Sequence, residues 1–369
     1  MNVEHVQFRD ESSISHQRPK GAWADIRAIG FPLLTNFWPV LLFVSQKVFV
    51  LPGIILTGFG DSKYRSDLVL AAVISLVGML VYFFQFANSY DQVHLVGFLL
   101  FVWSMPVLNY AVRFDHWKLR RFLTYFTLFN ATMGFFLLVT NIDLYGLRGL
   151  NQVIGSDGLT HRVYFESASL ATVVLVASFK RRWAQLAMLV VVMSFVLFIA
   201  KSVVIAVLLV LNLALPYILR SSPAVKVITV AISALVFVVL FFYLPVLRPD
   251  VGLSLAAKQY QFELITSSLG NSWSGWGWGS YYPQIASDPD QPYQVEMQLP
   301  MLLLQLGPLA LFAILGLTLA IFWSATDRPV MAFARFAIYT LIGFNNPWLF
   351  IPSWFLTCQL LFRYEHNDG

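Results

Sequence analysis

The stretch LAMLVVVMSFVLFIA, residues 186–200, has no polar face, because Ser194 is its single polar side chain. A helix on the surface of a soluble protein places polar residues on its outer face at every turn. The composition of the 369 residues agrees, since 58% are hydrophobic and 12% are charged, whereas soluble domains carry about 25% charged residues. Segments of alternating polarity, which are typical of membrane barrels, are absent from the sequence. We therefore expect an all-α, polytopic integral membrane protein.

Apolar runs long enough to cross a bilayer recur along the chain and predict about twelve transmembrane helices. The first two runs are interrupted by Lys47 and Pro52, so they form either a hairpin, which we prefer, or one long tilted helix. The predicted domains are a cytoplasmic tail (1–27), a single transmembrane domain (28–363) and a second cytoplasmic tail (364–369). The predicted spans are 28–44, 47–59, 68–87, 93–111, 122–140, 163–179, 183–200, 202–219, 226–245, 299–323, 330–346 and 348–362.

The charges indicate how the chain is oriented. The formal net charge is +5, and many lysines and arginines lie in alternate loops between the apolar runs. Because loops rich in these residues stay on the cytoplasmic side of a membrane, both termini are predicted to be cytoplasmic, and nucleic-acid binding is not expected. The single cysteine, Cys358, excludes an intrachain disulfide. The predicted cytoplasmic set comprises Lys63, Arg65, the run 113–121, the run 180–182, Arg220, Lys226 and Arg328.

Two predicted outward loops, 141–163 and 246–298, are far longer than a reversal of direction requires. Loops of such length are commonly functional. The second loop contains NSWSGWGWGSYYPQ, residues 271–284, in which glycines alternate with tryptophans. Its aromatic side chains are either interfacial anchors or flat faces offered to a sugar or a lipid. These candidates are Trp276, Trp278, Tyr281 and Tyr282.

Positively charged residues on the outward side need a reason, because that side is usually depleted of them. Lys201 joins two apolar runs with almost no loop, so its ammonium either reaches lipid headgroups or binds an anion inside a cavity. Lys258 lies on a predicted amphipathic helix, where it is either solvated or part of an anion site. The outward cations are Arg148, Arg162, Lys201, Arg248 and Lys258.

Arg162 and Glu166 are expected at the outer end of the predicted span 163–179. A spacing of four residues places both on one helical face. There they form either a structural ion pair or a phosphate clamp whose arginine is oriented by the acid. His161, beside Arg162, is either an interfacial residue or a base.

Glu296 stands where a polar loop meets an apolar run, and Pro300 suits the first turn of the helix that follows. A carboxylate at this position either complements the helix dipole or accepts a proton from a sugar hydroxyl. Asp288 and Asp290 imitate a metal-binding D-x-D motif, but a proline separates them and no partner ligand is nearby. A hydrated turn is therefore predicted there, and neither a metal nor a cofactor is expected.

Three segments carry a family resemblance: RVYFESASLA (162–171), IAKSVVIAV (199–207), and the stretch from KQYQFELI (258–265) through SGWGWGSYYPQ (274–284) to VEMQLPMLLLQLGPLA (295–310). Their order resembles the O-antigen polymerase and O-antigen ligase superfamily, often called Wzy and WaaL, over roughly residues 120–310. In that superfamily a catalytic position lies eleven residues before a helix glycine, as Glu296 lies before Gly307. Ligases usually carry His followed by Asn, Ser or Gln there, so Glu followed by Met favours a polymerase. Lys201 and Lys258 replace the usual arginines, and lysine lacks the two-pronged grip on phosphate.

The resemblance implies an integral-membrane glycosyltransferase (GT-C-like) fold with a long periplasmic loop cap, in the bacterial inner membrane, with its active site facing the periplasm. It also implies transfer between oligosaccharides carried on undecaprenyl pyrophosphate, in contact with membrane lipids and without a metal; a chain-length regulator is a further candidate partner. Glu296 is the implied base, supported by Glu166 and His161. The implied pyrophosphate ligands are Arg162, Lys201, Lys258 and Arg148, and the implied sugar-binding residues are Trp276, Trp278, Tyr281 and Tyr282.

Two rival functions stay open. An O-antigen ligase would transfer the finished glycan to the lipid A core. A lipid-linked sugar flippase or transporter would show inverted repeats, broken helices in matching halves, and ionisable groups near the middle of the membrane. This sequence shows no matched halves, and its charges crowd one face.

Overall fold

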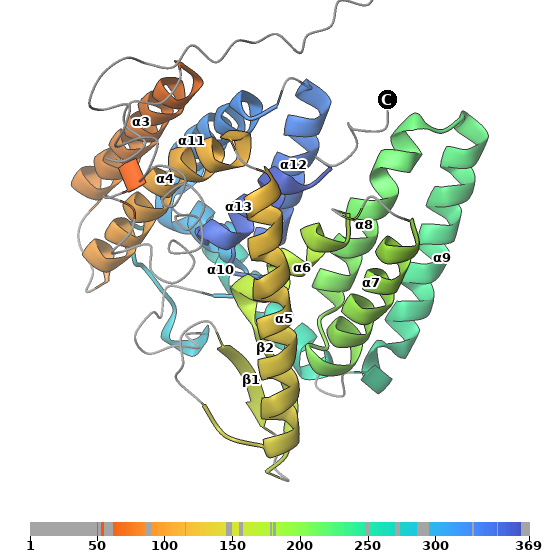
Figure 1. Ribbon diagram of the computed structural model, residues 1–369. Coiled ribbons are helices and arrows are strands. Elements are labelled where there is room, and N and C mark those ends of the chain that lie inside the picture. Colours follow the sequence, from red (N-terminus) through yellow and green to blue (C-terminus); the bar gives the residue numbers. More distant parts are fainter. Residues whose placement is uncertain are drawn as a thin grey trace, which may run out of the picture.

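The computed structural model places most of the chain from residue 62 onward (Figure 1). The spans expected at 28–44 and 47–59 and both predicted tails lie outside the described residues, except for Val50, Gly53 and Ile54. The described residues are 50, 53–54, 62–85, 90–114, 116–144, 150–154, 158–177, 179, 182–247, 251–269, 274–285, 295–326, 328–344 and 346–362.

These residues form α-helices joined by short turns, with one β-hairpin. The long helices are α3 (Ser62–Phe84), α4 (Asp91–Phe114), α5 (His116–Thr140), α8 (Val203–Arg220), α9 (Pro223–Leu247), α10 (Val251–Leu269) and α11 (Gln298–Ser324). The shorter ones are α6 (Glu166–Ala177), α7 (Arg182–Ser194), α12 (Pro329–Leu341) and α13 (Pro352–Leu360). The hairpin strands are β1 (Leu150–Ile154) and β2 (Thr160–Phe165), and the single turns are η2 (Phe195–Ile199), η3 (Pro283–Ile285) and η4 (Ile342–Phe344).

Four helices in the described part of the chain are long and apolar enough to cross a membrane. This agrees with a helical, membrane-embedded protein, but the described residues do not show the twelve expected spans. The four are Ser62–Phe84, Asp91–Arg113, Leu123–Thr140 and Gln298–Ser324.

The outward loop 141–163 contains an antiparallel hairpin, which corrects the all-α prediction. The expected span 163–179 is also wrong, because Thr160–Phe165 is a strand and α6 begins only at Glu166. Val163, Tyr164 and Phe165 are β-branched or aromatic, and they pair with the strand Leu150–Ile154. With twelve residues, α6 is about 18 Å long, shorter than a bilayer core of about 30 Å.

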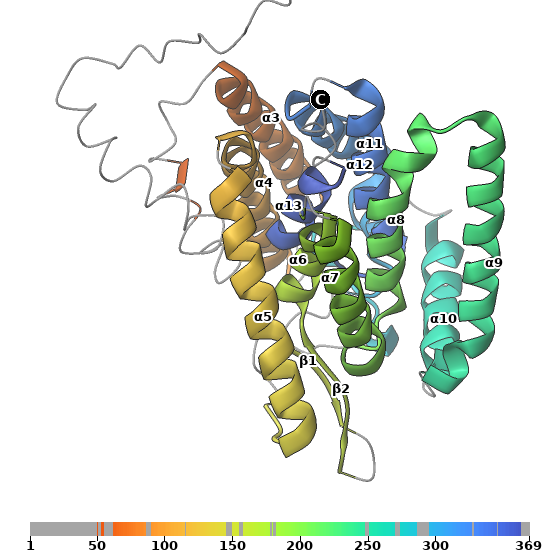
Figure 2. The ribbon, with the colours of Figure 1, turned by 45° about the vertical axis from the view of Figure 1, so that its right-hand side comes forward.

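The expected span 348–362 is also wrong, since α13 has nine residues and all of them are buried. It lies in the centre of the bundle, against α4, α6 and α12 (Figure 2). Buried polar groups satisfy its C-terminal end: the Arg335 Nε donates to Leu361 O at 2.7 Å, and the Phe362 N–H donates to Asn212 Oδ1 at 3.0 Å. Backbone carbonyl and N–H groups at the end of a helix need such partners where water is excluded.

A buried polar network joins α3, α4 and α11. The Asp67 carboxylate, fully buried on α3, lies 3.4 Å from the Arg113 guanidinium and accepts a hydrogen bond from the Asn109 amide at 3.0 Å. The Ser324 hydroxyl also donates to Asp67, and the Asn109 amide donates to Ile321 O at 3.0 Å. Buried ionisable groups in a membrane bundle are costly unless paired, so this network fixes the three helices relative to one another.

The helix connections divide between two ends of the molecule. The α4–α5, α8–α9 and α11–α12 junctions lie in the upper half of both views. The β-hairpin, the turn from η2 into α8 and the start of α10 lie in the lower half (Figures 1 and 2). Three junctions predicted to be cytoplasmic therefore lie toward one end, and three segments predicted to be outward lie toward the other (Figures 1 and 2).

Candidate functional site

The hairpin holds Arg162 in place. Arg162 and Tyr164 are two residues apart on β2, so they project from the same face of the strand. The Arg162 Nη2 donates to the Tyr164 hydroxyl at 2.7 Å, and the guanidinium carbon lies 4.9 Å from the centre of the Tyr164 ring. The Nε donates to Ala200 O at 3.0 Å. Arg162 therefore reaches the residue that immediately precedes Lys201.

Lys201 occupies a strained turn between η2 and α8. Its φ angle is +45°, a left-handed conformation that a residue with a β-carbon rarely adopts. The π-helical turn before it ends with the Ala200 N–H donating to Phe195 O at 2.9 Å and the Ser202 N–H donating to Val196 O at 3.1 Å. Both π turns and left-handed non-glycine residues concentrate at functional sites. The structure thus brings Arg162, one predicted anion ligand, to the turn that carries a second one, Lys201.

The conformation of Lys201 leads to a stability prediction. Lys201→Gly should have a free energy of unfolding about 1 kcal/mol higher than Lys201→Ala, because only glycine relieves the left-handed strain. Both variants remove the same positive charge. The measurement is denaturant unfolding of the two purified variants in one detergent, and equal free energies would contradict the structural role given to this turn.

Lys258 and Glu296 form an ion pair with 3.3 Å between Nζ and Oε2. The Lys258 side chain is 17% exposed and the Glu296 side chain 47% exposed. One turn along α10, the Gln261 Oε1 accepts a hydrogen bond from the Met297 N–H at 3.3 Å. α10 therefore contacts both the Glu296 side chain and the backbone of the residue that follows it. A second hydrophobic cluster, named here the outer cluster, includes both neighbours of Glu296 in the chain. It consists of Ile265, Ile285, Val295, Met297, Met301 and Leu304.

The aromatic residues of the glycine-rich loop have different environments. Trp276 is 38% exposed, and its ring centre lies 5.4 Å from that of Tyr282. Tyr281 and Tyr282 pack against the outer cluster, so this group lies beside the residues that flank Glu296. Trp278 is buried, and its indole N–H donates to Gly78 O at 2.8 Å. In this conformation only the other three offer surface to a ligand, and contact between Trp278 and a sugar stays a prediction that would require the loop to move.

The remaining predicted residues are less well placed. Arg148 lies outside the described residues, as does the side chain of Glu166. Glu166 begins α6 whereas Arg162 lies in β2, so the two do not share a helical face as predicted. His161 is exposed on β2 and, as the strand neighbour of Arg162, points to the opposite side.

The predicted ligands form two pairs on separate elements. β2 and η2 position Arg162 with Lys201, whereas α10 and the start of α11 position Lys258 with Glu296. Within the described residues, the structure does not place the two pairs in one cavity. The hairpin and the start of α10, the elements that carry Arg162 and lead to Lys258, lie toward the same end of the molecule (Figures 1 and 2).

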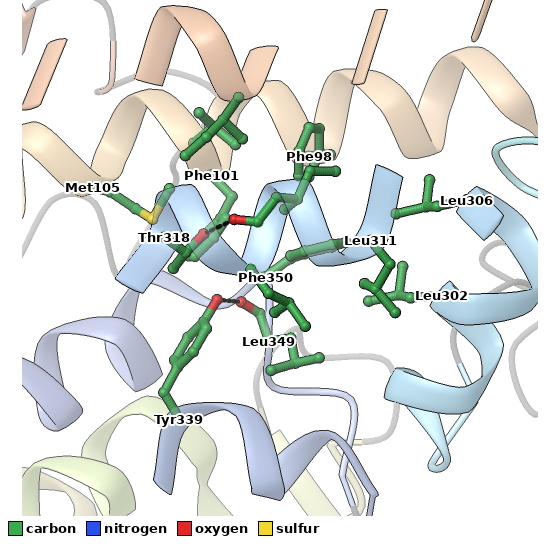
Figure 3. Close-up of a pocket in the computed structure, with 14 residues that line it drawn as sticks. Phe98, Phe101, Met105, Leu302, Leu306, Leu311, Thr318, Tyr339, Leu349 and Phe350 are labelled. Carbon is green, nitrogen blue, oxygen red and sulfur yellow. Dashed lines mark hydrogen bonds between the residues drawn. The ribbon is translucent and has the colours of Figure 1, made fainter. Parts of the chain in front are cut away.

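A cavity that the described residues do form lies elsewhere, between α3, α4, α11 and the turn at Leu349 and Phe350 (Figure 3). Its lining is almost wholly aliphatic and aromatic. The Thr318 hydroxyl donates to Ile314 O at 2.8 Å, and the Tyr339 hydroxyl donates to Leu349 O. Because both hydroxyls are engaged and no charged residue lines the cavity, it lacks groups for acid–base chemistry or for binding a phosphate.

Sequence reasoning missed the residues that hold the glycine-rich loop. They include Gly78 on α3, His94 on α4 and Gln305 on α11. The Gly307–Pro308 dipeptide was a usable signal, since such a pair marks a break in a helix. The residue spacing alone could not show which segment fills that break.

Comparison with protein-family models, with curated proteins and with solved structures found no match to this chain. The assignment of a function therefore depends on the side chains described above and on the resemblance of the three sequence segments.

Proposed function

We propose that the chain is a membrane glycosyltransferase that joins oligosaccharide repeat units carried on undecaprenyl pyrophosphate into a polysaccharide at the periplasmic face of the bacterial inner membrane. The observation that carries the proposal is the Lys258–Glu296 ion pair at the start of α11, beside exposed aromatic side chains. A carboxylate next to a fixed cation is the pair that this reaction requires.

In the proposed reaction, Glu296 accepts the proton of the attacking sugar hydroxyl. The hydroxyl oxygen forms a bond to the anomeric carbon of the donor sugar, while the bond from that carbon to the diphosphate oxygen breaks. The diphosphate leaves with the electron pair, and the proton stays on Glu296 until it is released to water. Fixed positive side chains favour the reaction because they stabilise the charge that develops on the leaving group.

The cations have distinct parts in this scheme. Lys258 lies beside the acid, where it stabilises the charge of the leaving diphosphate in this scheme. Arg162 and Lys201 bind the diphosphate lipid of a substrate at the same end of the molecule, and Trp276 with Tyr282 offers an aromatic surface to its sugar. Ring stacking suits the apolar face of a saccharide.

One observation favours the transporter alternative. Among the helices in the described residues, α11 contains an interior residue with positive φ, Gly307, and broken helices are common in transporters. A matching break in a second half is also required, and the described helices show none. The ligase alternative uses the same chemistry with lipid A core as the acceptor, and the acid at position 296 favours the polymerase by resemblance.

Deletion of the protein separates the three functions. For a polymerase, we expect the cell-surface lipid to carry single repeat units in place of a ladder of long chains on a gel. Loss of a ligase would leave bare core together with lipid-linked polymer. Loss of a flippase would leave no lipid-linked sugar on the outer leaflet. Either of the last two patterns would overturn the proposal.

A further inference from the structure

The break in α11 removes two backbone hydrogen bonds inside the bundle. In a continuous helix the N–H groups of residues 308 and 309 would donate to Leu304 O and Gln305 O. Pro308 has no N–H, and Gly307 has φ 73° and ψ 162°, far from helical values. Unpaired carbonyl groups are costly where water is excluded, so both carbonyls need other donors.

The glycine-rich loop, defined here as residues 274–280, supplies these donors. The Trp276 N–H donates to Leu304 O at 2.8 Å, and the Gly277 N–H donates to Gln305 O at 2.9 Å. The Gln305 side-chain amide donates in return to Ser280 O at 2.6 Å. The loop that was expected as an outward cap therefore completes the hydrogen bonding of a broken helix.

Two glycines of the loop have no room for a side chain. Gly275 has φ +81°, and a β-carbon on it would lie 2.5 Å from Gln305 O and 2.5 Å from the Gly307 nitrogen. Gly279 has φ +73°, and its β-carbon would lie 2.5 Å from the carbonyl carbon of Tyr90. Both the left-handed backbone and the contact distance therefore require glycine.

Trp278 fastens the same loop to two further helices. Its indole N–H bonds to Gly78 O on α3, and its ring centre lies 4.8 Å from that of Phe98 and 5.0 Å from that of His94, both on α4. The Gly279 N–H donates to His94 Nδ1 at 3.2 Å. The loop is thus joined to α3, α4 and α11.

These contacts fix the half of α11 that starts beside Glu296. The segment from Gln298 to Leu306 lies between the break, which the loop occupies, and the Lys258–Glu296 pair at its other end. Met297, which follows the acid, lies in the outer cluster, against which Tyr282 also packs. The loop also reaches the outer cluster, because the Trp276 ring contacts the Tyr282 ring, which packs against that cluster.

We infer that the glycine-rich loop is the positioning element for Glu296, and that Gly275 and Trp278 act on the reaction by holding the first half of α11 in register with α10. The description of Glu296 as a base rests on the proposed function, but the positioning itself does not. Gly275 and Trp278 are positioning residues, because neither needs to touch a substrate for this effect.

The test measures the Lys258–Glu296 distance without requiring activity. A water-soluble carbodiimide joins a lysine amine to a carboxylate at ion-pair distance, so the full-length protein in detergent should give a cross-linked peptide that mass spectrometry quantifies. In Gly275→Ala the added β-carbon collides with the backbone of α11 and displaces the loop from Leu304 O and Gln305 O. The substitution should lower the cross-link yield about fivefold, the change expected when one such hydrogen bond is lost. Gly316→Ala is the matched control. Gly316 lies on α11 beyond the break, and no atom lies within 4 Å of the added β-carbon.

Trp278→Phe is the second variant, since it keeps an aromatic ring but removes the donor to Gly78 O together with part of the buried indole. It should also lower the cross-link yield, and in both variants kcat for polymer formation should fall while KM for the lipid-linked donor stays unchanged. Equal yields in Gly275→Ala, Trp278→Phe and Gly316→Ala would overturn the inference. A lower yield with unchanged polymer formation would support the positioning and overturn the catalytic role of Glu296.

Discussion

Glu296→Gln is expected to stop polymer formation while the lipid-linked repeat unit accumulates. The amide keeps the size of the side chain and a hydrogen-bond acceptor for Lys258, but it cannot take the proton of the attacking hydroxyl. Removal of a general base slows a reaction by about 10²–10⁴-fold, which would leave no long chains on a gel. The measurement is the length distribution of surface glycan in cells that produce the variant.

Glu263→Gln is the matched control for this experiment. Glu263 is an exposed acid on α10, the helix that carries Lys258, and its carboxylate accepts a hydrogen bond from the Gln259 amide at 2.8 Å. That control should keep a normal ladder. Both variants must reach the membrane at the normal level. A normal ladder in Glu296→Gln would remove Glu296 from the mechanism.

Asp67→Ala is expected to lower the free energy of unfolding by about 3–5 kcal/mol, the range for breaking one partner of a buried ion pair. The substitution leaves the Arg113 guanidinium and the Asn109 amide without the carboxylate that they contact on α3. It also removes one of the two acceptors of the Ser324 hydroxyl on α11, the other being Ile321 O at 2.9 Å. Reversible unfolding in detergent measures the change.

A second substitution tests the physical reason. Asp67→Ala combined with Arg113→Leu should recover part of the lost stability, because a buried charge without its partner costs more than the absence of both. Asp67→Asn keeps the shape and one acceptor oxygen, so its loss should be smaller than that of Asp67→Ala. An ordinary surface substitution changes the free energy of unfolding by about 0.5 kcal/mol or less. If Asp67→Ala changes it by no more than that, the network does not fix the three helices.

The helices that sequence analysis placed best are those whose apolar runs are uniform. The expected spans 93–111 and 299–323 coincide closely with α4 and α11, because a run without a polar face has few alternatives to a buried helix. Hydrophobicity could not separate a spanning helix from a short central one. This is why Pro352–Leu360, buried on every side, was taken as a span.

The hairpin was missed because the residues of its second strand also fit the start of a helix. Arg162 and Glu166 fit one helical face by spacing, but Val163 to Phe165 also fit a strand, and the choice depends on residues 150–154. Among the predicted site residues, Lys258 contacts Glu296 and Arg162 contacts the turn of Lys201. The insertion of Trp276 and Gly277 into the break of α11 was not predicted. The donors to Leu304 O and Gln305 O lie almost thirty residues earlier in the chain, and backbone contacts over such a distance leave no periodic pattern in the sequence.

The most direct measurement uses the purified full-length chain in lipid vesicles that contain oligosaccharide repeats linked to undecaprenyl pyrophosphate. The proposed reaction predicts saccharides of two or more repeats on one lipid, with one undecaprenyl pyrophosphate released for each bond formed, and neither product with Glu296→Gln. Repeat units that stay single with the original chain, in vesicles where the protein is shown to be folded, would contradict glycosyl transfer by this protein.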